Sequence, residues 1–252
     1  MKSRISAVVI TLNVERTIKD CLSALSKVTK DIVIVDSYSE DATISICREK
    51  NARVFQRQWQ GYGEARNFGA RQCESDWILS IDADEVLSQD LISNINSLEL
   101  NRRSVYGLDR ITNLNGKWIR HSGWYPDWVS RLYHRNHASW SSDLVHERLE
   151  YDSGIKICRL KGKLWHYSYP DLKAFHLKLE KYALLAARQL HTDGGQSWWV
   201  MRYAGPVARF IRTLIFKWGF LDGRWGWFLS VQQARQVYLR HRYLVELNKG
   251  KP

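Results

Sequence analysis

Strand-like and helix-like segments alternate through the first hundred residues, and this order limits the fold more than any other feature of the chain. Residues 5–11 (ISAVVIT) form a continuous apolar, β-branched run, as expected for a strand buried on both faces. Further strands are predicted at 31–35, 53–56 and 77–81. Helices are predicted over 15–25, 40–50, 63–73 and 88–98, with Asp41 and Ser88 as N-caps. This order indicates an α/β fold with a doubly wound, mostly parallel sheet.

The pattern changes after residue 100. Shorter strands of a mixed sheet are predicted at 105–111, 117–120, 130–134 and 156–166. Helices follow, predicted over 172–191, 198–216 and 225–247, with a turn at 219–223. The chain is therefore expected to contain an α/β domain, 1–168, with halves 1–100 and 101–168, and a C-terminal helical region, 169–252.

An acidic cluster directly follows the strand predicted at 77–81. Asp82, Asp84 and Glu85 place three carboxylates within four residues, which repel one another unless they are solvated or neutralised by a cation. Oxygen-rich sites with few protein ligands suit Mg²⁺ or Mn²⁺, which complete their shells with water and substrate phosphates. Ligands of parallel sheets bind beyond the carboxyl ends of the strands, so we interpret this DXD segment as functional rather than as a solvated turn.

Four segments in register resemble the family 2 glycosyltransferases of the GT-A fold. They are VVITLNVE, DIVIVDSYSEDAT, GYGEARNFGA and WILSIDADE, and together they cover roughly the first 100 residues. The later segments WYPDWVSRLYHR, LVHERL and GFLDGRWG are similar to the lipopolysaccharide-core β-glucosyltransferase branch of that family. The resemblance implies inverting transfer of a hexose, glucose by this likeness, from a nucleotide diphosphate sugar, with UDP as the expected nucleotide. The expected acceptor is a lipid-linked or anionic glycan such as a lipopolysaccharide inner-core heptose.

The resemblance also implies roles for individual residues and makes 1–100 the nucleotide-binding half and 101–168 the acceptor half. In this scheme Asp84 ligates the divalent metal, and Asp82 approaches the ribose or the metal. The nucleotide and donor contacts would come from the other matching positions, namely Thr11, Asn13, Glu15, Asp36, Arg66 and Asn67. Ser37 stands where many relatives carry a second acid, which makes the expected contacts to base and ribose less secure than the metal site.

The transfer needs a carboxylate base, because the acceptor hydroxyl must lose a proton as it attacks. Glu147, in the HE pair with His146, is the predicted base, and Asp127 in WYPDW is the second choice. His146 would orient Glu147 or contact the donor. His166 can complete the metal shell or serve as a structural histidine, and Arg131 can contact phosphate or glycan or lie as a solvated strand residue.

The second half of the chain is basic and aromatic. Residues 1–126 hold 17 basic and 16 acidic residues, net +1, whereas 127–252 hold 21 basic and 10 acidic residues, net +11. Within 198–228, Trp and Tyr alternate with Arg209, Arg212 and Lys217, and helical spacing would place Phe210, Leu214 and Trp218 on one stripe. This composition predicts peripheral binding to an anionic membrane surface, on the inner face of the cytoplasmic membrane. A helical cap with its aromatics turned inward is the alternative.

Two other functions remain open from the residues alone. A nucleotidyltransferase is disfavoured, because TLNVE rather than a glycine-rich basic loop follows the first strand. A basic membrane- or nucleic-acid-binding module without catalysis is the other alternative. Carboxylates at the strand ends argue against nucleic acid on that face, so no nucleic-acid partner is expected. Cys21, Cys47, Cys73 and Cys158 form no CxxC pair, which is typical of reduced thiols in a cytoplasmic protein.

Overall fold

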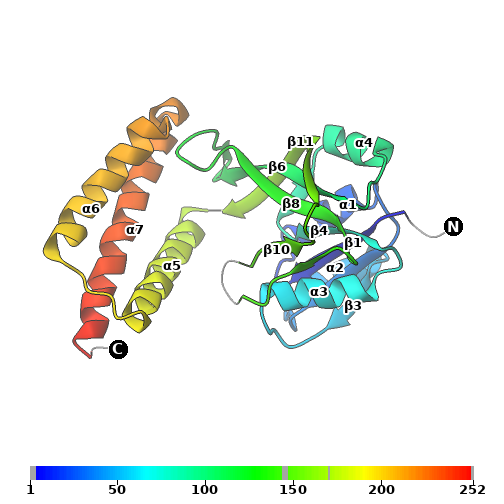
Figure 1. Ribbon diagram of the computed structural model, residues 1–252, viewed down its shortest axis with the longest axis horizontal. Coiled ribbons are helices and arrows are strands. Elements are labelled where there is room, and N and C mark those ends of the chain that lie inside the picture. The colour runs from blue at the N-terminus through cyan, green and yellow to red at the C-terminus, as the bar shows by residue number, and fades with distance from the viewer. Residues whose placement is uncertain (1–3, 144–146, 170, 251–252) are drawn as a thin grey trace. The chain divides into compact units, whose positions relative to one another are not determined.

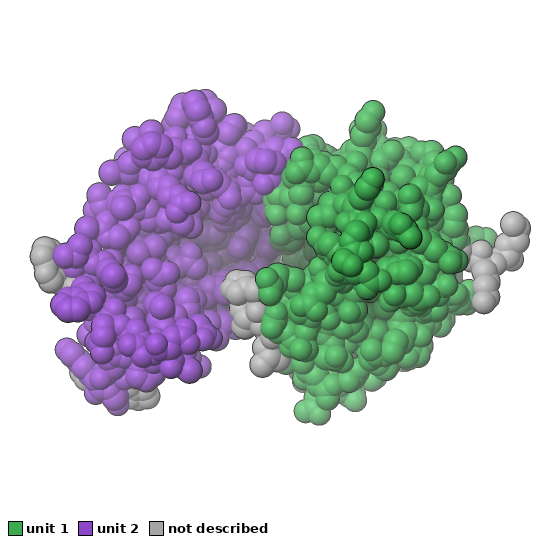
Figure 2. All heavy atoms as spheres, viewed as in Figure 1, with its two compact units in different colours: residues 1–110, 127–167 green, residues 111–126, 168–252 purple. Residues whose placement is uncertain are grey.

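The computed structural model describes residues 4–143, 147–169 and 171–250. The chain forms two units, one of residues 1–110 and 127–167 and the other of residues 111–126 and 168–252 (Figure 2). The segment 111–126, predicted within the acceptor half of the α/β domain, therefore groups with the C-terminal helices.

A mixed sheet organises the first unit, in the order β3-β2-β1-β4-β8-β6-β11-β5 (Figure 1). Its parallel part consists of β1 (Ser6–Thr11), β2 (Ile32–Asp36), β3 (Arg53–Gln56) and β4 (Trp77–Asp82). Its antiparallel additions are β8 (Asp127–His134), β6 (Ser104–Leu114), β11 (Lys156–Tyr169) and β5 (Glu85–Leu87). The predicted α/β fold is confirmed, with its parallel strands gathered in the first hundred residues.

Alternating side chains of the strands build a core on each face of this sheet. Ala7 and Val9 face a core to which α1 (Ile18–Leu25), α2 (Thr43–Glu49) and α4 (Gln89–Ser97) contribute. Val8 faces the opposite core, which includes residues of α3 (Tyr62–Gln72) and of the short hairpin β9 (Ala138–Trp140) and β10 (Leu149–Tyr151). The carboxyl ends of β1, β2 and β4 therefore meet at one edge, with helices covering both faces of the sheet.

Short elements account for most differences from the predicted secondary structure. The strands β5, β9 and β10 have three residues each, too few to show a periodicity of two. Ser88 caps α4 as predicted, by accepting a hydrogen bond from the Leu91 amide. The N-cap of α2 is Ala42 rather than Asp41, although the Asp41 carboxylate accepts a hydrogen bond from the Thr43 amide.

Three long helices dominate the second unit: α5 (Leu172–Thr192), α6 (Trp199–Ile211) and α7 (Arg224–Asn248). The strand β7 (Lys117–Trp118) pairs with the end of β6 in this unit. A π-helix, η1 (Arg212–Phe216), continues α6, and a 3₁₀ turn, η2 (Gly219–Asp222), leads into α7. The predicted stripe of Phe210, Leu214 and Trp218 is wrong, because the π-helix changes the helical period and Trp218 has φ 55° beyond the end of the helix. Among the described residues, no helix has both the length and the apolar character of a membrane span.

Candidate active site

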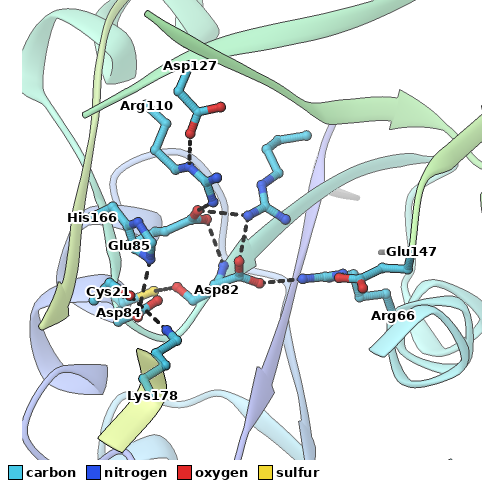
Figure 3. A network of polar contacts seen from close by, with 12 residues as sticks. Cys21, Arg66, Asp82, Asp84, Glu85, Arg110, Asp127, Glu147, His166 and Lys178 are labelled. Atoms are coloured by element: carbon cyan, nitrogen blue, oxygen red, sulfur yellow. Dashed lines mark hydrogen bonds and ion pairs between the residues drawn. The ribbon is translucent and has the colours of Figure 1, made fainter. Parts of the chain in front are cut away.

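The end of β4 and the start of β5 form the centre of the candidate site (Figure 3). Asp82 is the last residue of β4, and Glu85 is the first residue of β5. The Asp82 amide donates a hydrogen bond of 3.0 Å to Glu85 Oε2, which fixes the turn between them. Glu85 is fully buried, so its charge requires partners from elsewhere in the fold.

Two buried arginines enclose the Asp82 carboxylate. Arg66 Nη2 of α3 lies 2.6 Å from Asp82 Oδ1, and Arg131 Nη2 of β8 lies 2.5 Å from Oδ2. Burial alone would raise the pKa of Asp82, but the charges of Arg131 and Arg66 outweigh burial and hold this pKa well below its usual range. Asp82 therefore has both oxygens paired with guanidinium groups and anchors the two arginines, and its predicted ribose or metal contact stays a prediction.

The ion pairs continue on both sides of Asp82 and form a chain of alternating charge. Arg131 also reaches Glu85 Oε1 at 2.7 Å, and Arg110 Nη1 lies 3.2 Å from the same oxygen. Arg110 Nε then donates to Asp127 at 2.8 Å. At the other end, Arg66 Nη1 lies 2.6 Å from Glu147 Oε1. The two predicted candidates for the base, Glu147 and Asp127, therefore stand at the two ends of one network (Figure 3).

Asp84 lies outside this network and faces His166. The antiparallel pairing of β11 with β5 places His166 opposite Glu85, and His166 Nε2 lies 3.3 Å from Asp84 Oδ2. The Tyr167 amide donates to the Asp84 carbonyl at 2.8 Å, which holds the two segments together. No group of three or more His, Cys, Asp or Glu side chains with the placement of a metal site occurs within the described ranges. One carboxylate and one imidazole nevertheless fit a cation that takes its remaining ligands from phosphates and water.

The predicted nucleotide-contact residues at and after the ends of β1 and β2 connect the two loops that follow these strands by hydrogen bonds. Thr11 Oγ1 donates to Asp36 Oδ1 at 2.8 Å, and the fully buried Asp36 also accepts hydrogen bonds from Ser39. Asn13 Oδ1 accepts from the Glu40 amide at 2.9 Å, and Glu15 Oε2 accepts from the Ala42 amide at 3.0 Å. These contacts shape the edge of the sheet beside β4. The contacts of these residues with a nucleotide stay a prediction.

Close packing of α3 places Arg66 in the network. A Cβ on Gly69 would lie 2.5 Å from Val8 Cγ1, and a Cβ on Gly63 would lie 1.9 Å from the Ser141 carbonyl oxygen. Glycine at both positions lets the helix approach the sheet and the neighbouring loop. Arg66 also lies over the Trp140 ring, at 4.4 Å from its centroid.

Asn67 has a clear structural partner next to Arg66. Its Nδ2 donates to the Trp140 carbonyl at 2.8 Å, and its Oδ1 accepts from the Trp140 amide at 2.9 Å. Both ends of the amide therefore hold β9 against α3. The predicted contact of Asn67 with the nucleotide-sugar donor stays a prediction. His146, the predicted neighbour of the base, lies outside the described residues.

The ion pairs of two network members, Glu85 and Arg110, were not predicted from the sequence. Glu85 was visible as part of the acidic cluster, but its burial between Arg131 and Arg110 depends on strands that are distant in sequence. Arg110 lies within a predicted strand and carries no motif of its own. Only the antiparallel register, which pairs Arg110 with Asp127, reveals its place.

Comparison with known proteins identifies the family. The model of the glycosyl transferase family 2 matches residues 6–162. The chain belongs to this family. The predicted family resemblance and the predicted enzyme class, a glycosyltransferase, are thereby confirmed.

Two bacterial relatives match nearly the whole chain. An uncharacterized glycosyltransferase of Rickettsia typhi is 26% identical, over 96% of this chain and 90% of the relative. The lipopolysaccharide core biosynthesis glycosyltransferase LpsC of Rhizobium meliloti is 27% identical, over 95% of this chain and 94% of LpsC. Among solved structures, residues 1–349 of TarS from S. aureus align with a TM-score of 0.46 and 17% identity, over 100% of this chain and 92% of that chain.

The network predicts that Arg131 is essential for the stability of this family 2 domain. Arg131→Leu would leave the partly buried carboxylate of Asp82 and the fully buried carboxylate of Glu85 each without one partner, and we expect a loss of about 3 to 5 kcal/mol in the free energy of unfolding. Arg48→Leu is the matched control, because Arg48 is exposed on α2 and should change this free energy by about 0.5 kcal/mol or less. Denaturant unfolding of both variants measures the difference, and equal small losses would contradict the role of Arg131.

Proposed function

We propose that this glycosyltransferase catalyses the metal-dependent, inverting transfer of a hexose, glucose, from a UDP-sugar to a glycan hydroxyl. The observation that carries the proposal is the Asp84–His166 pair, which stands beside the arginine network at the carboxyl edge of the parallel strands. Ligands of such sheets bind at this edge. A pair of cation ligands next to fixed guanidinium groups is suited to a nucleotide diphosphate.

Asp84 and His166 would hold the Mg²⁺ or Mn²⁺ ion. When bound, the ion supplies positive charge to the diphosphate leaving group. Asp82 acts through Arg66 and Arg131, because its ion pairs hold both guanidinium groups in place. Thr11, Asn13, Glu15 and Asp36 would form the nucleotide side of the pocket, since they shape the loops after β1 and β2.

Glu147 is the proposed base. The acceptor hydroxyl gives its proton to a Glu147 oxygen as its own oxygen forms a bond to the anomeric carbon of the sugar. The bond from that carbon to the diphosphate breaks, and the electron pair leaves with the diphosphate. Attack from the side opposite the leaving group inverts the anomeric configuration. The 2.6 Å ion pair with Arg66 orients the Glu147 carboxylate for this step.

The proposed acceptor is a lipopolysaccharide inner-core heptose. Support comes from LpsC, a lipopolysaccharide core biosynthesis glycosyltransferase that matches this chain along nearly its full length. The net charge of +11 in residues 127–252 suits an anionic glycan. We also propose that the enzyme works in the cytoplasm at the inner face of the cytoplasmic membrane.

Exposed apolar side chains of the second unit support the membrane part of the proposal. In and around η1 and η2, Phe216 is 72% exposed, Trp218 59% and Phe220 50%. Large apolar side chains at this exposure favour an interfacial environment, and Trp is typical of membrane–water boundaries. The neighbouring cations would favour anionic lipids.

The nucleotide site can be tested by thermal denaturation with UDP, GDP, CDP and dTDP, each with Mn²⁺ or EDTA. We expect UDP with Mn²⁺, at about 100 times its dissociation constant, to stabilise the protein by about 2.7 kcal/mol, because it binds only the native state. Asp84→Ala and His166→Ala should abolish this shift. Asp90→Ala is the control, since Asp90 is an exposed acid at the start of α4. A metal-independent shift, or an unchanged shift in Asp84→Ala, would contradict the metal site.

The base can be identified from transfer rates of Glu147→Gln and Asp127→Asn. Loss of a general base typically lowers the rate by about 10²- to 10⁴-fold. We expect a loss of this size in kcat for Glu147→Gln, with the metal-dependent UDP shift preserved, and a smaller loss for Asp127→Asn. The opposite ranking would assign the base to Asp127.

Membrane binding can be tested by sedimentation with phosphatidylglycerol-containing vesicles. We expect the double variant Phe216→Ser, Trp218→Ser to bind such vesicles at least tenfold more weakly, because it removes large apolar side chains from the proposed contact. Leu177→Ser is the matched control, since Leu177 is 62% exposed on α5. Equal binding by the double variant and the wild type would exclude this surface as the membrane contact.

A further inference from the structure

A separate cavity lies entirely within the second unit. Its volume is about 520 Å³, and all of its lining residues come from segment 122–124 and from residues 169–236. This volume lies within the range of small-molecule sites, about 300 to 1,000 Å³. The cavity lacks every residue of the Asp84 site, so the proposed donor chemistry does not explain it.

Three cations line this cavity. They are Arg209 at the end of α6, Arg212 in η1 and Lys217, and the lining includes no Asp or Glu. None of the ion pairs found in the described part of the chain involves these three side chains. Burial lowers the pKa of Arg209, and the nearby charges of Arg212 and Arg240 lower it further. Such an arrangement is stabilised when an anion enters.

The cationic wall is held in place by specific contacts. Gln233 Oε1 of α7 accepts hydrogen bonds from Arg209 Nε at 3.0 Å and from Thr213 Oγ1 at 3.3 Å. The Arg209 contact uses Nε, so the proposed ligand would be bound by the Nη groups. Gln233 Nε2 donates to the Ser122 carbonyl at 3.2 Å, and the Ser122 amide donates to the Lys217 carbonyl at 2.9 Å.

The backbone around the cavity has two features that are typical of a binding site. Arg212 and Thr213 belong to the π-helix η1, and such π-turns within helices occur frequently at functional sites. The buried carboxylate of Asp222 accepts hydrogen bonds from the amides of Arg120 and His121 and from Ser122 Oγ, which fixes the 122–124 segment of the lining. The cavity is therefore framed by several segments that are distant in sequence.

The rest of the lining favours a saccharide. Trp124 and Tyr169 lie on the cavity with ring centroids 5.6 Å apart, and they offer flat apolar surfaces to the C–H faces of a sugar ring. Gln233 and Gln236 bring amides, which both donate to and accept from hydroxyl groups. Arginine guanidinium groups match the oxygens of a phosphate. A ligand with a phosphate at one end and a sugar ring beside it would satisfy each of these groups.

We propose that this cavity binds a phosphorylated saccharide, with Arg209, Arg212 and Lys217 on the phosphate and the aromatic and amide side chains on the sugar. The assignment of this ligand as the acceptor rests on the proposed function. It makes a phosphate-bearing sugar the acceptor class. Binding itself requires neither the donor site nor the metal.

The test is calorimetric titration of the full chain with glucose 6-phosphate, glucose and inorganic phosphate as probes. We expect glucose 6-phosphate to bind at least tenfold more tightly than either glucose or phosphate, because only it uses both parts of the cavity. Arg212→Ala should weaken glucose 6-phosphate binding about tenfold, or about 1.4 kcal/mol. Arg224→Ala is the matched control and should leave it unchanged, since Arg224 is exposed in the same unit and does not line the cavity.

Other arms separate this proposal from its rivals and from the donor site. Equal losses in Arg212→Ala and Arg224→Ala, or no binding of glucose 6-phosphate, would overturn it. Phosphatidylglycerol vesicles that bind in an Arg212-dependent way, without binding of glucose 6-phosphate, would assign the cavity to lipid phosphate and also overturn it. Retention of the Mn²⁺-dependent UDP shift in Arg212→Ala is expected. If the wild type shows no Mn²⁺-dependent UDP shift but still binds glucose 6-phosphate, the donor site alone is refuted.

Discussion

The ion pairs of Asp82 with Arg66 and Arg131 are the constraint on which the first unit depends. Asp82 ends a central parallel strand, Arg66 lies on a helix against one face of the sheet, and Arg131 lies on an antiparallel strand. A buried carboxylate is tolerated only when its charge is compensated, so these elements must meet before any of the charges can leave water. The same contacts extend to Glu85 and Glu147, so a stabilising network also orients the proposed base.

The sequence predicted those parts of the fold that depend on local patterns. Continuous apolar runs such as 5–11 identified the parallel strands, and the position of Asp84 just after such a run placed it beyond the carboxyl end of β4. Partners across long separations could not be predicted, because Arg131 and Glu85 meet only through the order of β4, β8 and β5. The partner of Asn67 could not be predicted either, because its side chain binds the backbone of Trp140, which is distant in sequence.

In the second unit, the sequence gathered cations and aromatics into one stretch, and the structure separates them by role. Arg209, Arg212 and Lys217 line a cavity, whereas the exposed side chains of Phe216 and Trp218 do not. A regular helix would have kept a single periodic stripe. The π-helix at 212–216 and the left-handed backbone of Trp218 break that period, and neither leaves a clear signal in composition or spacing.

The two units handle charge in opposite ways, and this contrast bears on how the substrates are recognised. In the first unit the arginines are matched by carboxylates, and a diphosphate would be bound beside them through the proposed cation of Asp84 and His166. In the second unit the cavity lining holds cations and no carboxylate, so the proposed anion would be bound directly. If donor and acceptor both carry phosphate, the enzyme would distinguish them by how the phosphate charge is neutralised: by a metal ion for the donor and by protein cations for the acceptor. The proposed metal would bind at the first site through a carboxylate, and it would be repelled from the second, where the lining is positive.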